Sequence, residues 1–329
     1  MHFSIFSMLF LSAALALCAD LDPTILVYEF PRGVWLENLA VRPCGSILLT
    51  TLTKPDLYMV DPLKSQPQPK LLHTFSSTTW LTGITETTPD TFYVSAANGS
   101  LKTLEIAPGS NRLFRVSFPP NKDPNFSSAA TVTDAKFING ITRFSNDIVL
   151  AADSQTGVVW AVNVATGVSR IAVNDPLLAN VPGPPPIGVN GIKIRNGRTL
   201  YFTNSAQNIF GKVELKADGT AAGPAVIVTH SLPGDSYDDF AFDHKGDAFL
   251  ATASGNSVAE LMPNGKQEII AGNINSTEIA EPTSAQFGRT RRDKGTLNVT
   301  TAGGLAVPVN GNEVVGGQLV AVDVMQWTG

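Results

Sequence analysis

The chain has 329 residues, of which 43% are hydrophobic and 16% are charged. This composition can fill a large core and is not that of a disordered protein. The formal net charge of -5 at pH 7 provides no basic surface, so we expect neither nucleic acid nor an anionic membrane as a partner.

The N-terminal segment from Phe3 to Leu17 is almost wholly apolar. It is too short to span a bilayer and is followed directly by sequence typical of a folded domain, which is the pattern of a secretory signal peptide. We therefore expect residues 1–16 to be a signal peptide, with cleavage after residue 19 as the alternative. Residues 17–329 are expected to form a single domain in the secretory pathway, secreted or luminal.

The cleavage position decides the cysteine chemistry. Cleavage after Ala16 leaves Cys18 on the mature chain, where an oxidising compartment favours a disulfide with Cys44. Cleavage after residue 19 removes Cys18, and Cys44 is then expected to be a buried free thiol. Export also makes the Asn-X-Ser/Thr sequons usable for glycosylation. They begin at Asn98, Asn125, Asn275 and Asn298, and the last of these is the least favoured because it lies in a strand-like run.

A repeated phrase dominates the rest of the chain. A polar or small pair and an apolar residue recur in WLENLAV (Trp35–Val41), WLTGITE (Trp80–Glu86), FINGITR (Phe137–Arg143), GVNGIKI (Gly188–Ile194), SYDDFAF (Ser236–Phe242) and EPTSAQF (Glu281–Phe287). A second strand candidate follows each copy: SILLTT, TFYVSAA, DIVLAAD, TLYFTNS, DAFLATA and TLNVTT. The third candidates are DLYMVD, SLKTLEI, GVVWAVNV, GKVELK, SVAELM and QLVAVDV.

Six such copies, roughly 50 residues apart, predict an all-β fold, a six-bladed β-propeller. A β-sandwich is the alternative, but it does not require six equivalent copies. The strand-like segment Thr24–Phe30 precedes the first copy and has no sheet of its own. We expect it at the outer edge of the last blade, where it closes the ring and covers an edge strand.

The first strand of each propeller blade lines the central axis, so the six phrases place one polar residue each at a common level. These residues are Glu37, Thr82, Asn139, Asn190, Asp238 and Thr283. Burying such groups is costly unless they bind one another, water, a metal or a ligand. A closed hydrogen-bond network with water and a ligand site both fit the pattern.

Three aromatic residues stand two positions earlier in their phrases, on the same face by strand alternation. The series at this level is Trp35, Trp80, Phe137, Gly188, Ser236 and Glu281. An exposed aromatic wall above convergent polar groups is the expected form of a small-molecule site. The alternative is that the rings fill a gap between blades.

The phrases FINGI and GVNGI resemble those of the gluconolactonase/regucalcin-type propellers of the strictosidine synthase superfamily, and the blade pattern matches over essentially the whole mature chain. The resemblance implies a divalent metal on the axis, and the four oxygen donors suit Ca²⁺ or Mg²⁺. The implied ligands are Glu37, Asn139, Asn190 and Asp238. The lactonases carry an Arg where this chain has Phe137, so we expect a small apolar or aromatic substrate instead of a polar sugar lactone.

The chain also resembles the fungal hetero-Diels–Alderases of tropolone sesquiterpenoid pathways. The likeness lies in the overall build, the signal peptide and the aromatic residues expected at the mouth of the channel. This resemblance implies a cycloaddition between a tropolone quinone methide and a macrocyclic, humulene-like terpene, with no cofactor required. The catalytic candidates are then Thr82, Asn139, Asn190 and Asp238. The substrate-binding candidates are Trp35, Trp80, Phe137, Tyr237 and Thr283.

Two other functions stay open from the sequence. In a metal-dependent lactonase, Ca²⁺ or Mg²⁺ polarises the lactone carbonyl and acidifies a bound water, with Asp238 as ligand and base. In a non-enzymatic propeller, the surface binds a small molecule or another protein. The sequence leaves the oligomeric state open.

Overall fold

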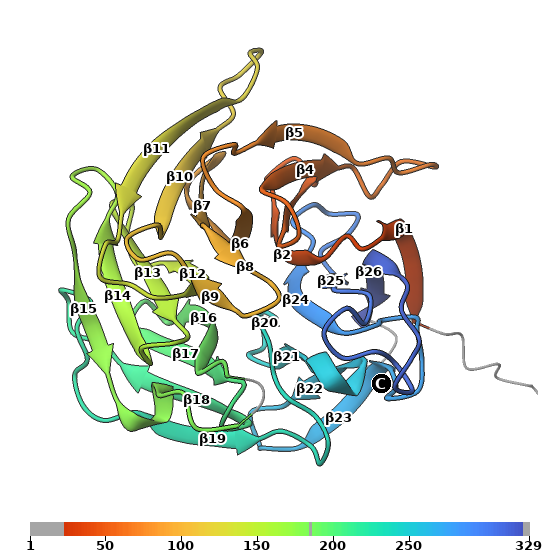
Figure 1. Ribbon diagram of the computed structural model, residues 1–329. Helices are drawn as coiled ribbons and strands as arrows, with labels where there is room; N and C mark the ends of the chain where they lie inside the picture. Colours follow the sequence, from red (N-terminus) through yellow and green to blue (C-terminus); the bar gives the residue numbers. More distant parts are fainter. Residues whose placement is uncertain (1–22, 184–185, 325–329) are drawn as a thin grey trace, which may run out of the picture.

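The computed structural model describes residues 23–183 and 186–324. Within them the chain forms six four-stranded antiparallel sheets, arranged as blades around a central axis (Figure 1). The predicted all-β six-bladed propeller is therefore confirmed. The helical segments of this part of the chain are two 3-10 turns, η1 (Pro176–Leu178) and η2 (Ala253–Gly255). Neither these nor any other described segment makes a helix long and apolar enough to cross a membrane.

Each blade runs from an inner strand at the axis to an outer strand at the rim. The inner strands are β2 (Leu36–Val41), β6 (Trp80–Thr88), β12 (Ile138–Arg143), β16 (Val189–Arg195), β20 (Phe240–Phe242) and β24 (Pro282–Phe287). The second strands are β3 (Ile47–Thr51), β7 (Thr91–Ala97), β13 (Ile148–Asp153), β17 (Thr199–Asn204), β21 (Ala248–Ala251) and β25 (Thr296–Thr301). The third strands are β4 (Asp56–Val60), β10 (Arg112–Ser117), β14 (Val158–Asn163), β18 (Ile209–Glu214), β22 (Ser257–Leu261) and β26 (Gly316–Asp323). The outer strands are β5 (Lys70–Thr74), β11 (Asn125–Thr131), β15 (Ser169–Asn174), β19 (Val226–His230), β23 (Gln267–Gly272) and β1 (Thr24–Arg32).

The first strand of the described chain closes the ring. β1 pairs antiparallel with β26, with Ile25 opposite Ala321, and lies at the outer edge of the sheet that β24, β25 and β26 complete. Figure 1 shows the red N-terminal strand beside the blue C-terminal one. The predicted closure of the last blade by the N-terminal segment is confirmed.

The third strand of blade two differs from the prediction. SLKTLEI was expected there, but β10 takes that place and the predicted segment belongs to a short hairpin, β8 (Gly99–Ser100) and β9 (Glu105–Ile106). The physical reason is burial, because β10 carries the fully buried Leu113 and Val116 whereas Leu101 is exposed. The hairpin is inserted between β7 and β10 and crosses the centre of the ring in Figure 1.

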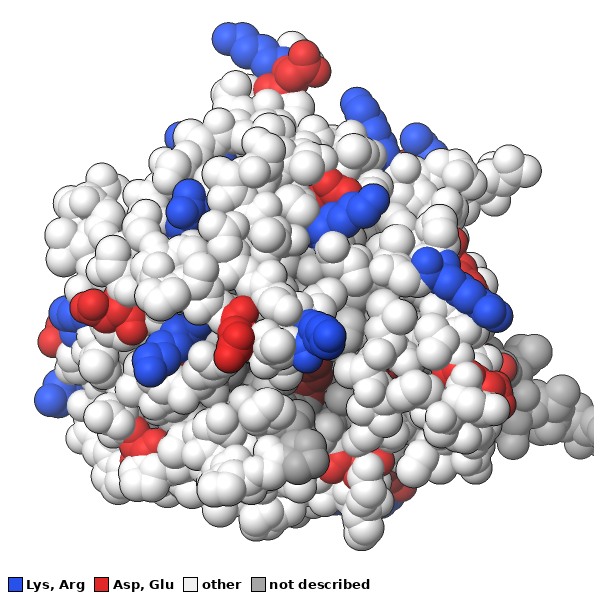
Figure 2. All heavy atoms as spheres, viewed as in Figure 1, with Lys and Arg blue, Asp and Glu red and all other residues white. Residues whose placement is uncertain are grey.

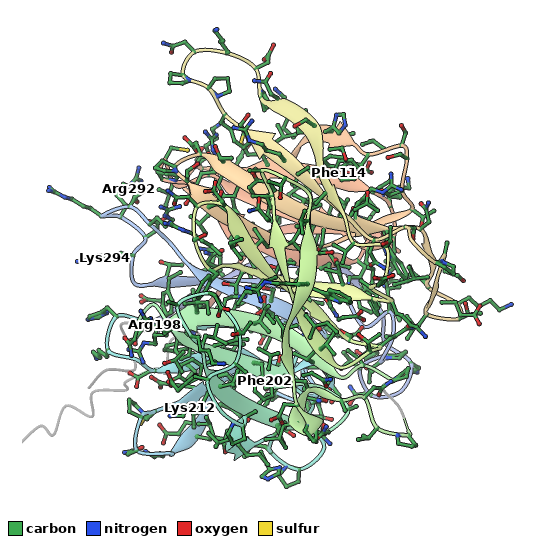
Figure 3. The ribbon with its side chains drawn as sticks, turned by 90° about the vertical axis from the view of Figure 1, so that its left-hand side faces the viewer. Phe114, Arg198, Phe202, Lys212, Arg292 and Lys294 are labelled. Carbon is green, nitrogen blue, oxygen red and sulfur yellow. The ribbon has the colours of Figure 1, made fainter. Side chains whose placement is uncertain are left out.

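Apolar side chains fill the space between neighbouring sheets. One core cluster joins Val159 of blade three to Phe202 of blade four, and both are fully buried. In the side view of Figure 3, Phe202 lies inside the stack of sheets, whereas Arg292 and Lys294 project from its edge. Burial of apolar area between the blades is the main favourable term in the stability of the fold.

Each junction between blades is also bridged by a hydrogen bond to the inner strand of a neighbouring blade. At five junctions a side-chain hydroxyl donates to a backbone carbonyl at 2.7–2.9 Å: Thr50 to Thr82, Thr82 to Ile138, Ser154 to Val189, Ser205 to Tyr237 and Thr283 to Leu36. Between blades five and six the backbone N–H of Asp239 donates to the carbonyl of Thr283 at 3.1 Å. These bonds satisfy buried carbonyl groups that the blade's own ladder leaves free.

β-Bulges interrupt five of the six inner strands at the predicted polar level, and β20 is the exception. The strand register shifts between Leu36 and Asn38, Leu81 and Ile84, Ile138 and Ile141, Val189 and Ile192, and Pro282 and Ser284. A bulge adds a residue to one strand and redirects its side chain. The repeated phrase therefore encodes a repeated irregularity of the backbone, which explains its small and polar composition.

The predicted modification sites fall in different environments. Cys18 and the signal peptide lie outside the described residues, so the disulfide and export stay predictions. Cys44 is exposed, and the expectation that it would be buried if unpaired is wrong. Asn125 and Asn275 are exposed and Asn98 is half-buried. Asn298 is only 2% exposed within β25, so the folded protein does not present this sequon for glycosylation.

Replacing Thr50 by Val should lower the free energy of unfolding by about 1–3 kcal/mol, because it leaves the buried carbonyl of Thr82 without its donor. Thr131→Val is the matched control, since Thr131 is exposed on β11, and it should change stability by less than about 0.5 kcal/mol. Urea denaturation measures both. Wild-type stability in the Thr50 variant would show that the hydroxyl does not hold the two blades together.

Candidate functional site

Glu37, Asn190 and Asp238 meet at the axis, as the alignment of the phrases predicted. The amide of Asn190 is hydrogen-bonded to the carboxyl group of Asp238, and the charges of Asp238 and Glu37 affect each other. Asn139 belongs to the neighbouring inner strand. There the backbones run so close that a Cβ added at Gly140 would lie 2.4 Å from the carbonyl oxygen of Asn190. The Asn-Gly pairs of the phrases thus allow the strands to converge.

Thr82 and Thr283 lie at the same level along the axis, but their hydroxyl groups make structural hydrogen bonds. The Thr82 hydroxyl donates to the carbonyl of Ile138 and lies 2.6 Å from the hydroxyl of Ser95. The Thr283 hydroxyl donates to the carbonyl of Leu36, and both threonines are 1% exposed. Neither hydroxyl is free to contact a substrate in this structure, so the placement does not fit the catalytic role predicted for Thr82 or the substrate contact predicted for Thr283.

Glu37 is a buried carboxyl group held by an indole. It is 5% exposed, and its Oε2 accepts a hydrogen bond from Nε1 of Trp35 at 2.6 Å. Burial raises the pKa of Glu37 to about 8, although the hydrogen bond from Trp35 partly opposes this rise. The negative charges of Asp239 and Glu281 add to the increase.

Asp238 shares this environment. Burial raises the pKa of Asp238 well above its usual range, and the charges of Glu37, Asp239 and Glu281 raise it further. The hydrogen bond from Asn190 acts in the opposite direction. Since like charges and low polarity both disfavour ionisation, the axis is a site where a cation or a hydrogen-bond donor would be favoured.

Glu281 has a structural role that the alignment of the repeated phrases did not reveal. It has a φ of 54°, which is unusual for a residue other than glycine, and it is 4% exposed. One carboxylate oxygen accepts a hydrogen bond from the backbone N–H of Ala306 at 3.0 Å. The carboxyl group therefore anchors the loop between β25 and β26. Burial raises the pKa of Glu281 to about 7, while hydrogen bonds from the 305–307 backbone oppose the rise.

The three predicted aromatic residues form one cluster on the leading side of the polar ring. Trp80 and Phe137 stack with ring centroids 5.6 Å apart, and Trp35 packs against them. The predicted exposed wall is wrong in one respect, because Trp80 and Phe137 are 1% and 3% exposed. The hairpin covers them: Gly99 lies directly on the Trp80 indole, and Ile106 joins the cluster. Trp35 remains half-buried.

Two further contacts define this compartment. The hairpin is tied to blade three, since Nε2 of Gln155 donates to the carbonyl of Leu104 at 2.8 Å. The indole N–H of Trp80 is buried and has no hydrogen-bond partner among the described residues. A buried donor without a partner costs free energy unless a ligand or water satisfies it.

Tyr237 lies away from the aromatic cluster. It is fully buried with Phe210 and Phe240 between blades four and five, and its hydroxyl donates to the side chain of Gln267. The prediction that Tyr237 stacks on a substrate does not fit this placement. Tyr237 precedes β20, the short inner strand of blade five, and its ring packs into the core between the blades instead of facing the axis.

The donor set at the axis is compatible with a hard divalent cation. Glu37 and Asp238 offer carboxylate oxygens, Asn190 offers an amide oxygen, and the amide of Asn139 makes no hydrogen bond within the described protein. Carboxylate and amide oxygens are the ligands that Ca²⁺ and Mg²⁺ prefer. Burial raises the pKa of Glu37 and Asp238, and a bound cation would act in the opposite direction by favouring their ionised forms. The described residues hold no cluster of three or more His, Cys, Asp and Glu suited to a metal.

The sequence is similar to two curated proteins with the same name, although no family model matches it. A protein of Phoma sp provisionally named hetero-Diels–Alderase is 26% identical over 308 residues, which cover 84% of this chain and 86% of that protein. The protein asR5 of Sarocladium schorii, provisionally given the same name, is 27% identical over 319 residues, 84% of this chain and 78% of that protein. The chain resembles hetero-Diels–Alderases. The resemblance inferred from its build is confirmed.

Solved structures show the same fold at low sequence identity. A luciferin-regenerating enzyme superposes with a TM-score of 0.65 at 14% identity, over 91% of this chain and 94% of that one. Regucalcin of Agrobacterium tumefaciens, a calcium-binding protein, gives a TM-score of 0.59 at 16% identity over 91% and 94%. The predicted likeness to gluconolactonase/regucalcin-type propellers therefore holds for the fold.

Replacing Glu281 by Gln should weaken the pH dependence of stability. The pKa of this carboxyl rises from 4.5 to about 7 on folding. The folded protein therefore binds more protons than the unfolded chain between these values, and wild-type stability falls as the pH rises through this range. The fall attributable to Glu281 is on the order of 3 kcal/mol.

The Gln side chain keeps an acceptor for the Ala306 N–H but does not titrate. Urea denaturation across this pH range should show a smaller loss in the variant than in wild type. Glu278→Gln is the control, because Glu278 is exposed, and it should behave like wild type. An unchanged pH slope in Glu281→Gln would contradict the assignment.

Proposed function

We propose that this protein is a hetero-Diels–Alderase that joins a tropolone quinone methide-type diene to a macrocyclic, humulene-like terpene. The observation that carries the proposal is the half-buried indole of Trp35, which packs against the buried Trp80–Phe137 stack on the leading side of the polar ring. Similarity to two proteins provisionally named hetero-Diels–Alderases supports it. Figure 2 shows Lys, Arg, Asp and Glu side chains scattered over this face, with uncharged surface between them.

A cycloaddition depends more on the positioning of its two reactants than on acid–base catalysis. A cycloaddition requires no nucleophile, so the protein contributes by holding both reactants in one geometry and by donating hydrogen bonds to a carbonyl as its charge grows. The half-exposed ring of Trp35 is the surface on which a flat diene stacks. Its orientation is fixed by the hydrogen bond to Glu37.

The side-chain amide of Asn139 has an unused hydrogen-bond donor. The side-chain N–H groups of Asn190 are used by Ser205 and Asp238, so Asn190 orients Asp238 and does not reach a carbonyl. The side chain of Asn139 has no partner within the described protein. The buried indole N–H of Trp80 is a second unpaired donor at this end of the channel.

A metal-dependent lactonase is the second candidate function. The convergent oxygen donors of Glu37, Asn190 and Asp238 favour it. Glu37, Asn139, Asn190 and Asp238 would hold Ca²⁺ or Mg²⁺, which when bound polarises a carbonyl and acidifies water. Phe137 disfavours this candidate, because it stands where the lactonases that the chain resembles carry an Arg, and a phenyl ring cannot hydrogen-bond a polar sugar lactone.

Trp35→Ala and Asn139→Ala should each lower the rate of cycloadduct formation about tenfold or more, because one loses the stacking surface and the other a donor to the developing charge. The reactants are a tropolone quinone methide generated in situ and humulene, and product ratios are measured by chromatography. Tyr201→Ala is the control, a half-buried aromatic residue outside the channel. Wild-type rates and product ratios in both Trp35→Ala and Asn139→Ala would refute the proposal.

Chelation separates the two candidate functions. EDTA should leave the cycloaddition rate unchanged, since this reaction needs no Lewis acid, whereas it should abolish any hydrolysis of a lactone. The same protein sample is assayed for both reactions with and without added Ca²⁺. A cycloaddition that stops with EDTA and returns with Ca²⁺ would show that the metal takes part.

A further inference from the structure

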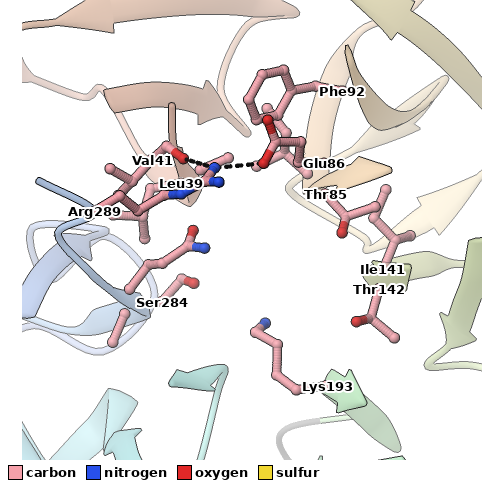
Figure 4. Close-up of a pocket in the computed structure, with 14 residues that line it drawn as sticks. Leu39, Val41, Thr85, Glu86, Phe92, Ile141, Thr142, Lys193, Ser284 and Arg289 are labelled. Carbon is pink, nitrogen blue, oxygen red and sulfur yellow. Dashed lines mark hydrogen bonds and ion pairs between the residues drawn. The ribbon is translucent and has the colours of Figure 1, made fainter. Parts of the chain in front are cut away.

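A cavity opens at the end of the channel opposite the aromatic cluster. It has a volume of about 250 Å³ and is lined by 14 residues from blades one, two, three, four and six (Figure 4). The lining residues of each inner strand, such as 39–41 and 84–86, come after the polar positions Glu37 and Thr82. Because all inner strands run in the same direction along the axis, this cavity and the aromatic cluster lie at opposite ends.

An ion pair forms the floor of the cavity. Nζ of Lys193 lies 2.6 Å from both carboxylate oxygens of Asp239, which is 2% exposed. Asn38 and Ser284 donate to Oδ2 of Asp239 at 3.0 Å each, and the Phe240 N–H donates to Oδ1 at 2.8 Å. The carboxylate is therefore saturated with donors. Two of the three ammonium hydrogens of Lys193 are used, and its side chain is 27% exposed.

A second ion pair stands at the rim. The guanidinium of Arg289 pairs with Glu86 and donates to the carbonyl of Val41 at 2.9 Å. The other oxygen of Glu86 accepts the backbone N–H of Asp90 at 2.7 Å. Each carboxylate oxygen of Asp239 and of Glu86 thus has a hydrogen-bond partner. Arg289 retains free N–H groups, because its interactions with Glu86 and Val41 both use Nη1.

Three polar side chains around the cavity make no hydrogen bond within the described protein: Thr85, Thr142 and Gln286. In Figure 4 the polar ends of Lys193 and Thr142 face the open centre. Four apolar side chains complete the wall, and each is at most 6% exposed: Leu39, Ile84, Phe92 and Ile141. The Thr and Gln side chains can donate or accept, whereas Lys193 and Arg289, each paired with a carboxylate, can only donate.

We propose that this cavity is a second ligand site, which binds a small organic carboxylate. The carboxylate accepts from the free ammonium hydrogen of Lys193 and from the Thr142 hydroxyl, and its carbon skeleton lies against the apolar wall. Charge-assisted hydrogen bonds of this kind are the strong ones. The site is independent of the reaction at the aromatic end, from which the Asp239–Lys193 pair separates it.

The test is isothermal titration calorimetry of the full-length protein with malonate, with sulfate as the inorganic comparison. We expect one malonate per chain with a dissociation constant of about 1 mM or below, and weaker binding of sulfate, which cannot use the apolar wall. Thr142→Val should weaken malonate binding about tenfold. This variant should fold normally, since the Thr142 hydroxyl has no partner in the protein. Thr131→Val, on the outer strand of blade two, is the matched control and should bind like wild type.

Lys193 is tested together with its partner. Lys193→Met alone leaves the buried Asp239 charge unpaired and can unfold the chain, so the double variant Lys193→Met/Asp239→Asn removes both charges. It should bind malonate at least tenfold more weakly than wild type. Absence of malonate binding to wild type, or equal affinity in wild type, Thr142→Val and the double variant, would overturn the proposal. Sulfate binding as tight as that of malonate would overturn the assignment of an organic ligand.

Discussion

The hydrogen bonds between neighbouring blades at the axis are the constraint on which the rest of the structure depends. A propeller sheet cannot cover its own faces, so each blade must be fixed against the next around a closed ring. In this protein hydroxyl groups such as those of Thr50 and Ser154 donate to the carbonyl groups of the next inner strand. These bonds hold the inner strands close enough for side chains from different blades to meet.

The same arrangement divides the polar ring into two kinds of residue. A threonine hydroxyl is short and reaches only the backbone of the next strand, so Thr82 and Thr283 join blades. Longer side chains reach past the backbone to the axis, where Glu37 and Asp238 influence each other's charge. Burying two carboxyl groups together is unfavourable in itself. The hydrogen bonds from Trp35 to Glu37 and from Asn190 to Asp238 partly offset this cost.

Asp239 lies between the two ends of the channel. It follows Asp238 directly, yet it faces the opposite side and is enclosed by Lys193, Asn38 and Ser284. Its fixed charge raises the pKa of Glu37 at one end, while its partner Lys193 forms the floor of the cavity at the other. The charge of Asp239 thus acts on Glu37 at one end of the channel and on Lys193 at the other.

The sequence by itself determined the six blades, the closing strand and the level of the polar ring, because strand alternation and a repeated phrase are local properties of the chain. It also identified Trp35, Trp80 and Phe137 as neighbours. Only the tertiary structure decided which of these side chains are accessible. The insertion of 99–106 covers Trp80 and Phe137, and it could not be told from a blade strand by its composition. Likewise the Lys193–Asp239 pair joins residues 46 positions apart, and its formation depends on the distance between two blades, which no local pattern encodes.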